Sequence, residues 1–423
     1  MIIPSIDIQG GQAVQLINGE KLAVEAGDPS PLAERFGRTG PIAVIDLDAA
    51  MGTGSNREQI KTLCQQTRCR VGGGIRDAQT ALDWLNNGAE QIIIGTAASR
   101  ELLAQLPRER VLVALDAKYD EVVVNGWTKG TGRTVESRME ELRDVVAGFL
   151  VTFVENEGLM QGTRLDRVAA LQNAAGGCSL TIAGGVTTAE DIRRLDALGV
   201  DAQVGMALYT GRMSLAEGFA APLTSDRPDG LWPTVVVDEH DRALGLCYSN
   251  LQSLTEALES GRGVYWSRSR GLWKKGESSG ATQQLLAVDI DCDRDTLRFK
   301  VRQNGPGFCH LKTLSCFGNL GGLPALSERL ERRKEKAPQG SYTKRLFADP
   351  ELLSAKLREE AQELTEAQAA EDVVWEAADV FYFTLATLAQ RGVPLTEVLH
   401  QLDQRALQVT RRPGNAKTKE TLQ

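Results

Sequence analysis

The sequence has few histidines, few cysteines and no excess of positive charge. Only three histidines and seven cysteines occur among its 423 residues, and the formal net charge is -8 at pH 7. This acidic balance provides no global basic field for nucleic acid, so we expect no nucleic-acid partner. Seven cysteines in so long a chain do not indicate a disulfide scaffold, and clustered cysteines are better explained as metal ligands.

Long apolar runs are also lacking. No window approaches the roughly 18 consecutive apolar residues that span a membrane, and the start MIIPSIDIQGG lacks the pattern of a signal peptide. We therefore expect a cytoplasmic protein with no membrane partner. At 42% hydrophobic content, a chain of this length is expected to form roughly two to three domains.

Short β-branched runs alternate with helical patterns from residue 1 to about 220. The runs are MIIPSIDI, PIAVIDLD, CRVGGGI, EQIIIGTA, RVLVALDA, AGFLVTF, SLTIAGG and DAQVGMA. Eight strands between helices predict a closed parallel β/α barrel of the TIM type over residues 1–221. An internal repeat supports this, because residues 71–98 and 182–208 share a GG pair, an alanine, a glycine and a final G-x-A.

Two further domains are expected after the barrel. The segment PLTSDRPDGLWP (222–233) indicates a linker. Beyond it, a hairpin, a helix from about Leu251 and several strands predict a small β-rich α+β domain over 228–320. The charged stretch ERLERRKEKAPQGS (328–341) is expected to be a second linker. Helical patterns over 350–370, 372–391 and 395–408 then predict an all-α domain over 341–412.

The motif DIDCDRD carries alternating acidic residues. On an extended segment the side chains of Asp291, Asp293 and Asp295 share one face, and three carboxylates suit Mg²⁺. Cys292 would point the other way. The alternative is an acidic loop that is simply solvated.

Two cysteines follow in GPGFCHLKTLSCFG. Together with Cys292, the thiolates of Cys309 and Cys316 suit zinc with an open fourth position that activates water. His310 stands beside one of these thiols and is expected to move protons near neutral pH. Buried cysteines without metal and a structural histidine are the alternatives.

The motifs SRSRGLWKKGESSG, DCDRD, CH (309–310) and SCF (315–317) resemble phosphoribosyl-AMP cyclohydrolase over about residues 228–318. The resemblance implies hydrolytic opening of the adenine ring of phosphoribosyl-AMP. It also implies that the three cysteines bind zinc across the interface of a homodimer and that the three aspartates bind magnesium. Phosphate contacts are expected from four cations, for which a solvated turn is the alternative. These cations are Arg268, Arg270, Lys274 and Lys275. The run GLCYSN (245–250) departs from the family pattern.

Carboxylates also recur on the expected helices. Glu360 and Glu363 share one helix face, as do Glu376 and Asp379 on the next helix, although such spacing is common on solvated faces. Here the residues border apolar runs, and buried carboxylates need cations. With SYTKRLF, these motifs resemble phosphoribosyl-ATP pyrophosphohydrolase, an ATP-related nucleotide hydrolase, over about 341–412. The resemblance implies Mg²⁺ held by the four carboxylates.

Additional groups are expected to assist at this helical site. Glu359 would be an auxiliary ligand, and Lys344, Arg345 and Lys356 would meet phosphates. The sequence FYFT after EAAD departs from the family, which usually has a histidine after the tyrosine.

Glycines follow two pairs of barrel strands. In a β/α barrel the carboxyl ends of the strands form the active face, where glycines let backbone amides approach a phosphate. The duplicated placement predicts two phosphate sites, with plain turns as the alternative. One would be formed by Gly73, Gly74 and Gly95, and the other by Gly184, Gly185 and Gly205.

Asp7 and Asp116 end strands one and five, where they would flank the middle of a bisphosphate substrate as general acid and base. The motifs MIIPSIDI, VIDLDAA, VGGGIR, VALDA, NGWTKG, VTFVENEG, IAGG and GMALY resemble the histidine-pathway isomerase that performs an Amadori rearrangement. The resemblance implies that Asp7 is the base, Asp116 the acid and Thr152 a positioning hydroxyl. It also implies that Arg76 and Trp127 bind substrate.

Three departures bear on the barrel. The stretch IQGGQ lacks an aspartate, Gln15 stands where an arginine is usual, and Glu157-Gly158-Leu159 replaces Asp-Gly-Thr. Our leading hypothesis is a trifunctional enzyme of histidine biosynthesis acting on phosphoribosyl nucleotides. A second hypothesis keeps both hydrolases and makes the barrel an inactive scaffold. A third is a non-catalytic sensor of nucleotide phosphates.

Overall fold

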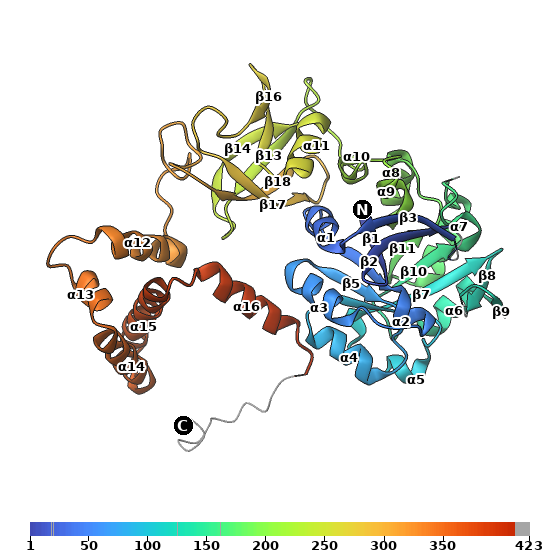
Figure 1. The fold of residues 1–423 in the computed structure, drawn as a ribbon, viewed down its shortest axis with the longest axis horizontal. Helices are drawn as coiled ribbons and strands as arrows, with labels where there is room; N and C mark the ends of the chain where they lie inside the picture. The colour runs from blue at the N-terminus through green and yellow to red at the C-terminus, as the bar shows by residue number, and fades with distance from the viewer. Residues whose placement is uncertain (18, 20, 125, 161, 411–423) are drawn as a thin grey trace. The chain divides into compact units, whose positions relative to one another are not determined.

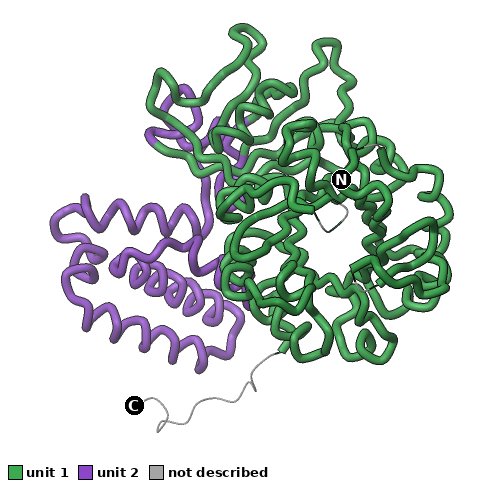
Figure 2. Tube along the Cα trace, turned by 45° about the vertical axis from the view of Figure 1, so that its right-hand side comes forward, with its two compact units in different colours: residues 1–236, 246–304, 406–423 green, residues 237–245, 305–405 purple. Residues whose placement is uncertain are grey.

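The computed structural model describes residues 1–17, 19, 21–124, 126–160 and 162–410. Residues 411 and 412, the last of the expected all-α domain, lie outside this part. Two compact units divide the chain (Figure 2). The first contains residues 1–236, 246–304 and 406–423, and the second contains 237–245 and 305–405.

Eight parallel strands close into a barrel near the N-terminus (Figure 1). In the order in which they pair, the strands are β1 (Ile2–Gln9), β4 (Ile42–Asp46), β5 (Cys69–Gly72), β6 (Gln91–Ile94), β7 (Val111–Lys118), β10 (Gly148–Phe153), β11 (Ser179–Ala183) and β12 (Asp201–Val204). Pairing of β12 with β1 closes the ring. The closed β/α barrel predicted from the sequence is confirmed.

Helices and two additional hairpins complete the barrel. The helices are α1 (Pro29–Gly37), α2 (Leu47–Met51), α3 (Arg57–Gln66), α4 (Ala78–Asn86), α5 (Arg100–Leu103), α6 (Val135–Leu142), α7 (Leu165–Ala175), α8 (Ala189–Ala197), α9 (Met206–Tyr209) and α10 (Leu215–Ala220), with short 3₁₀ turns η1 (Arg108–Arg110) and η2 (Val154–Asn156). The antiparallel strands β2 (Gln12–Ile17) and β3 (Lys21–Gly27) extend β1, while β8 (Glu121–Val124) and β9 (Lys129–Thr134) extend β7.

The internal repeat folds in the same way in both halves. Gly73 after β5 and Gly184 after β11 have φ of +94° and +85°, in the left-handed region that favours glycine. The helix that follows each glycine turn is capped by a polar side chain. Asp77 accepts from the backbone N–H of Thr80 at α4, and Thr188 accepts from that of Asp191 at α8.

A small β-rich region follows the barrel. Its elements are β13 (Trp232–Val237), β14 (Ala243–Ser249), α11 (Leu251–Ser260), β15 (Val264–Ser267), β16 (Gly271–Lys274), β17 (Gln283–Ile290) and β18 (Leu297–Gln303). Four strands form a sheet in the order β14-β13-β18-β17, and β15 pairs with β16 as a separate hairpin. The predicted hairpin, the helix beginning at Leu251 and the later strands are confirmed.

The last region is helical. It contains α12 (Gly322–Lys336), α13 (Tyr342–Ala348), α14 (Pro350–Glu366), α15 (Ala370–Arg391) and α16 (Leu395–Leu407). Leu330, Leu346, Leu353 and Phe383 belong to its buried apolar core. No helix in the described ranges has the length and apolar character needed to cross a membrane.

The expectation of a linker over 328–341 is wrong for most of that stretch. Residues 322–336 form α12, and Leu330, on its apolar side, is 1% exposed in the same core as the later helices. The charged residues on the other faces of α12 hid this helix, because a single apolar stripe suffices to hold a surface helix. Only the end of the stretch, before α13, is not helical.

Candidate active sites

Two carboxyl groups stand at the carboxyl ends of barrel strands. Asp7 lies on β1, and Asp116 lies on β7 beside Thr152 of β10. Burial raises the pKa of Asp7 to about 7. Burial also raises the pKa of Asp116, against the effect of hydrogen bonds from Trp127 and Thr152. Carboxyl groups with a raised pKa are suited to general acid–base work.

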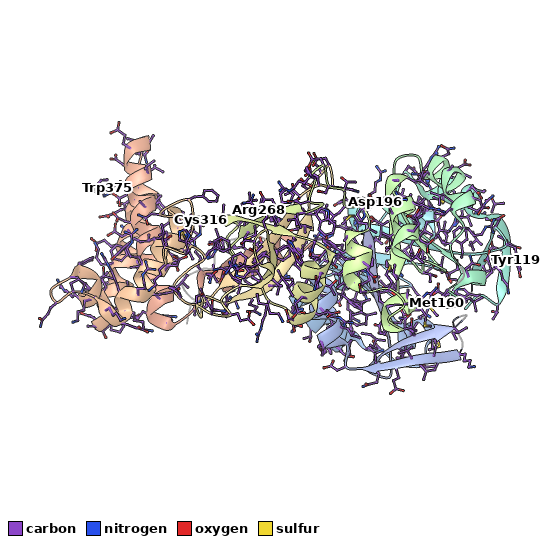
Figure 3. The ribbon with its side chains drawn as sticks, turned by 90° about the horizontal axis from the view of Figure 1, so that it is seen from above. Tyr119, Met160, Asp196, Arg268, Cys316 and Trp375 are labelled. Atoms are coloured by element: carbon purple, nitrogen blue, oxygen red, sulfur yellow. The ribbon has the colours of Figure 1, made fainter. Side chains whose placement is uncertain are left out.

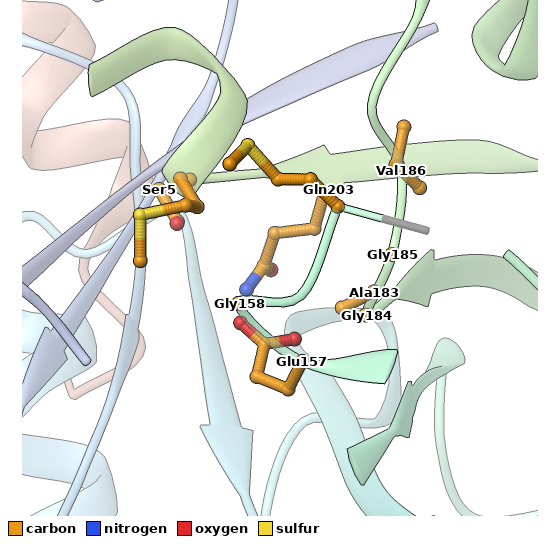
Figure 4. Close-up of a pocket in the computed structure, with 11 residues that line it drawn as sticks. Ser5, Glu157, Gly158, Ala183, Gly184, Gly185, Val186 and Gln203 are labelled. Carbon is orange, nitrogen blue, oxygen red and sulfur yellow. The ribbon is translucent and has the colours of Figure 1, made fainter. Parts of the chain in front are cut away.

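A third carboxyl group, that of Glu157, lies beside them after β10. Burial, followed by the charges of Asp7 and Asp116, raises its pKa to about 7. Its side chain lines a pocket and points toward the amide of Gln203 (Figure 4). The barrel mouth therefore contains three acids whose ionisation is mutually dependent.

Four of the six expected glycines line two separate pockets. Gly184, Gly185 and Gly205 line the pocket that contains Glu157 (Figure 4). Gly95 lines a second pocket of about 230 Å³ together with Asp116. Gly73 and Gly74 line neither of these pockets, so the first predicted glycine group is represented there by Gly95 alone.

Four of the six expected glycines are required by close approach: a Cβ on Gly73 would lie 2.2 Å from the carbonyl oxygen of Asp46, and one on Gly184 would lie 2.4 Å from that of Phe153. A Cβ on Gly74 would lie 2.6 Å from the Cβ of Ala49, and one on Gly185 would lie 2.2 Å from the carbonyl oxygen of Gly162. At the remaining two the surroundings differ. Gly95 has open space around it, whereas a Cβ on Gly205 would lie 2.4 Å from Oε1 of Gln15.

The two expected substrate-binding residues of the barrel are engaged with the protein. Trp127 hydrogen-bonds to Asp116 and has φ of +68°. Arg76 is exposed, and its guanidinium donates to the carbonyl oxygens of Ala49 at 3.2 Å and Ala50 at 2.8 Å. Trp127 is therefore in contact with the predicted acid, while Arg76 is hydrogen-bonded to the short helix α2 after β4.

The acidic motif forms the turn between β17 and β18. Asp291, Asp293 and Asp295 each offer an oxygen, and these oxygens lie within 4.8 Å of one another. Desolvation opposes ionisation of Asp291, but backbone hydrogen bonds from Thr296 and Asp295 outweigh it and lower the pKa. Ionised oxygen donors in such a group fit a hard divalent cation.

The three cysteines are arranged differently. Cys309 is buried, whereas Cys292 and Cys316 are exposed. The sulfur of Cys309 lies 3.8 Å from Nδ1 of His310 and accepts from the backbone N–H of Leu311 at 3.5 Å. Thiols suit zinc, but no group of three possible metal ligands in the described part of the chain includes a cysteine.

Cations and aromatic rings surround the SRSRGLWKKG hairpin. Arg268 lies 5.0 Å from the ring centre of Tyr248. Arg270 and Lys275 lie 5.4 Å and 5.7 Å from the ring centre of Trp273. These predicted phosphate ligands come together on one hairpin. Lys274 instead forms an ion pair of 2.7 Å with Glu256.

Carboxylates from α14 and α15 meet in the helical region. Oxygens of Glu360, Glu376 and Asp379 lie within 4.8 Å of one another, and Glu363 makes a second such group with Glu359 and Glu360. Glu360 is only 5% exposed. Desolvation, followed by the charges of Glu363, Glu360 and Asp379, raises the pKa of Glu376. Such a cluster fits a divalent cation.

Lys356 is the one of the three expected helical phosphate cations that contacts these acids. Its Nζ lies 2.7 Å from Glu360 and 3.0 Å from Glu359. Hydrogen bonds to Glu360 and Glu359 raise the pKa of Lys356.

Three family models match the chain in succession. The model described as "Histidine biosynthesis protein" covers residues 1–214, which is half of the chain. The chain belongs to this histidine biosynthesis family. Phosphoribosyl-AMP cyclohydrolase matches residues 245–318, and phosphoribosyl-ATP pyrophosphohydrolase matches 323–406. The family domains therefore occur in the order predicted from the motifs.

Individual relatives also carry histidine biosynthesis names. A histidine biosynthesis trifunctional protein of Komagataella pastoris is 40% identical over 335 residues, covering 78% of this chain and 37% of that protein. The histidine biosynthesis bifunctional protein his7 of Schizosaccharomyces pombe is 52% identical over 206 residues, 49% of each chain. The chain thus spans less than half of these two relatives.

The barrel has a relative of its own size. An imidazole-4-carboxamide isomerase of Gemmatimonas aurantiaca is 39% identical over 235 residues, covering 52% of this chain and 99% of that protein. This isomerase is therefore matched over nearly its whole length.

Sequence reasoning missed part of the surroundings in this histidine biosynthesis barrel. Glu157 was noticed only as a departure from the family pattern, and Ser5 and Gln203 were not singled out, although all three line the pocket in Figure 4. Gln15 is 3% exposed and lies against Gly205. The sequence does contain a signal for Ser5 and Gln203. They lie on two predicted barrel strands, β1 and β12, and these strands pair in the barrel.

Proposed function

We propose that this chain catalyses three steps of histidine biosynthesis in the reverse of their order along the sequence. Residues 341–412 would hydrolyse phosphoribosyl-ATP, residues 228–320 would open the adenine ring of phosphoribosyl-AMP, and residues 1–221 would isomerise the formimino product. The observation that carries this proposal is that each chemical constellation lies in the segment matched by the corresponding family model. The protein would act as a cytoplasmic homodimer on phosphoribosyl nucleotides.

In the barrel, an Amadori rearrangement needs a proton delivered to the ring oxygen of an aminoaldose and a proton removed from its C2. Asp116, whose pKa is raised by burial, is suited to donate the first. Asp7, with a pKa of about 7, is ionised in an appreciable fraction of molecules at neutral pH and would accept the second. Thr152 and Trp127 hold Asp116 in place through hydrogen bonds.

The glycine pockets would hold the two ends of the substrate. Backbone N–H groups at glycine turns can approach phosphate oxygens without a side chain in between. Gly95 borders the pocket of Asp116, and Gly184, Gly185 and Gly205 border the pocket of Glu157. A molecule with a phosphate at each end would therefore extend across the acids at the barrel mouth.

In the cyclohydrolase segment, Cys292, Cys309 and Cys316 would hold zinc, with a second chain completing the site. When bound, zinc supplies an activated water for attack on the adenine ring. Asp291, Asp293 and Asp295 would hold Mg²⁺. Arg268, Arg270 and Lys275 would bind the substrate phosphate, and His310 would move a proton beside Cys309.

In the helical segment, Glu360, Glu363, Glu376 and Asp379 would hold Mg²⁺, with Glu359 as an auxiliary. When bound, Mg²⁺ neutralises charge on the phosphoanhydride that water cleaves. Lys356 already lies among these acids and would contact phosphate oxygens. Lys344 and Arg345, on α13, would contribute from the neighbouring helix.

Assays of the purified full chain on each of the three substrates test the proposal. We expect turnover of all three, and we expect Asp116→Asn to lower isomerase kcat by about 10²–10⁴-fold while both hydrolase rates stay unchanged. Absence of all three activities in the wild type would instead favour the hypothesis of a non-catalytic sensor of nucleotide phosphates.

The scaffold hypothesis for the barrel remains the second candidate because of two side chains. Gln15 lies against Gly205 where the isomerase family usually has an arginine, and Leu159 replaces a hydroxyl residue. Hydrolase turnover without isomerase turnover would favour this bifunctional form.

A further inference from the structure

The acidic turn of the cyclohydrolase segment contains an arginine whose side chain binds an aspartate of the barrel. Arg294 stands between Asp293 and Asp295 in sequence. Its guanidinium instead reaches the barrel, where Nε lies 2.5 Å from Oδ2 and Nη2 lies 2.8 Å from Oδ1 of Asp196. This is a two-point ion pair between the turn and the end of α8, where Asp196 is labelled in Figure 3.

The barrel end of this pair is well buried. The side chain of Asp196 is 7% exposed, and that of Arg294 is 33% exposed. A carboxylate that is removed from water holds its bound guanidinium more strongly than an exposed surface carboxylate does.

The backbone of Arg294 is fixed as well. Its carbonyl oxygen accepts from the backbone N–H of Thr224, in the segment after the barrel, at 2.8 Å. Its φ is +64°, a conformation that costs a non-glycine residue about 1 kcal/mol. Glycine would adopt this turn more readily, so an arginine here is best explained by what its side chain binds.

The consequence concerns the availability of the aspartates. A guanidinium forms strong hydrogen bonds to carboxylates, so an arginine bound to these aspartates would compete with a divalent cation for their oxygens. With the guanidinium bound to Asp196, the oxygens of Asp291, Asp293 and Asp295 lie within 4.8 Å of one another.

We propose that the Arg294–Asp196 ion pair has a positioning role. It keeps the guanidinium of Arg294 away from the magnesium site of the cyclohydrolase segment, where the guanidinium would compete with the metal ion. It also fixes the acidic turn against the barrel. The inference rests on the proposed cyclohydrolase function. It gives the barrel a role in ring opening whether or not the barrel catalyses isomerisation.

Three variants of the full chain test this role. Asp196→Asn releases Arg294 toward the aspartates, so the Mg²⁺ concentration for half-maximal ring opening should rise about tenfold, with kcat recovered at saturating Mg²⁺. Arg294→Gln removes both the anchor and the competitor and should have a smaller effect. Glu190→Gln is the matched control, because it breaks only exposed pairs with Arg193 and Arg194 on the same helix.

A second readout does not depend on activity. Mn²⁺ binding would be measured by electron paramagnetic resonance in a background carrying Glu360→Gln and Glu376→Gln, which removes the helical site. We expect Asp196→Asn to weaken the remaining Mn²⁺ site about tenfold, Arg294→Gln to weaken it less, and Glu190→Gln to leave it unchanged.

The outcomes separate the inference from the proposed function. Unchanged Mg²⁺ and Mn²⁺ dependence in both Asp196→Asn and Arg294→Gln would overturn the inference, even if their melting temperatures fall. Should Asp196→Asn not fold, an unchanged Mn²⁺ affinity in Arg294→Gln would overturn it alone. A wild type without ring-opening activity would refute the cyclohydrolase function, and the Mn²⁺ measurements would still decide the role of the ion pair.

Discussion

At the scale of single residues, the acids of the barrel mouth make a stability prediction. A carboxyl group whose pKa is raised in the folded state holds a proton that the unfolded chain has lost, so stability falls as pH rises from about 4 to about 7. The pKa of Asp7, about 7 in the folded protein, places it in this class. Asp7→Asn removes the effect, and its advantage over wild type should grow between pH 4.5 and 8.

We expect that advantage to reach about 4 kcal/mol, or about 8–16 °C in the melting temperature of the barrel. Calorimetric scans of both proteins at several pH values would measure it. A constant difference across this range would show that Asp7 is ionised in the folded protein at all of these pH values.

Glu157 gives a prediction about binding rather than stability. It shares its pocket with Gly184, Gly185 and Gly205, and its pKa is about 7. Above pH 7 the ionised carboxylate would repel a phosphate in that pocket, so the isomerase KM should rise with pH. Glu157→Gln should flatten this rise by about threefold or more between pH 7 and 8.5. Steady-state KM profiles of the two proteins would compare them, and parallel profiles would place the phosphate elsewhere.

The candidate site was predictable where strands dictate it. Asp7 and Asp116 end parallel strands, and such ends meet on one face of a barrel. Glu157 follows η2 in a connecting loop, whose course the strand pattern does not fix. Its approach to both aspartates is a long-range contact that needed the structure.

At the scale of elements, the proximity of the acidic residues on α14 and α15 lowers the stability of the helical region. Desolvation and three neighbouring carboxylates raise the pKa of Glu376. Without metal, Glu376→Gln should therefore raise the melting temperature of the helical region by about 2 °C or more at pH 8, and by less at pH 5.

Added Mg²⁺ should reverse that order. It should stabilise the wild type but leave Glu376→Gln nearly unchanged, because the variant lacks one of the grouped oxygens. Glu366→Gln, on the same α14 but outside the cluster, is the matched control and should respond to Mg²⁺ like the wild type. Thermal scans in chelator and in Mg²⁺ make the comparison, and equal responses in all three proteins would argue against a metal at this cluster.

Helices and strands could be predicted where their buried residues form a clear apolar pattern in the sequence. All eight barrel strands were predictable because both faces of such strands are apolar. The strand β9 was not predicted, since all six residues of Lys129–Thr134 are exposed and show no alternation. Similarly, α12 was not predicted, because it buries only a narrow apolar stripe that includes Leu330. Its many charged residues make this stripe hard to recognise in the sequence.

At the scale of the whole molecule, the three cysteines proposed as zinc ligands bear on how subunits assemble. No group of three possible metal ligands within the described ranges includes a cysteine, yet Cys292, Cys309 and Cys316 are the donors that suit zinc. A twofold dimer resolves this if Cys292 of one subunit meets Cys309 and Cys316 of the other, because symmetry then builds two equal sites.

This arrangement predicts complementation between two inactive variants. Cys292→Ser and Cys309→Ser should each lose zinc and ring opening. After unfolding together and refolding as a mixture, half of the dimers should be mixed, and each mixed dimer should contain one intact site. Zinc content and turnover should therefore recover to about a quarter of the wild-type values. If all three thiolates came from a single chain, neither variant could supply what the other lacks, and mixing would recover nothing.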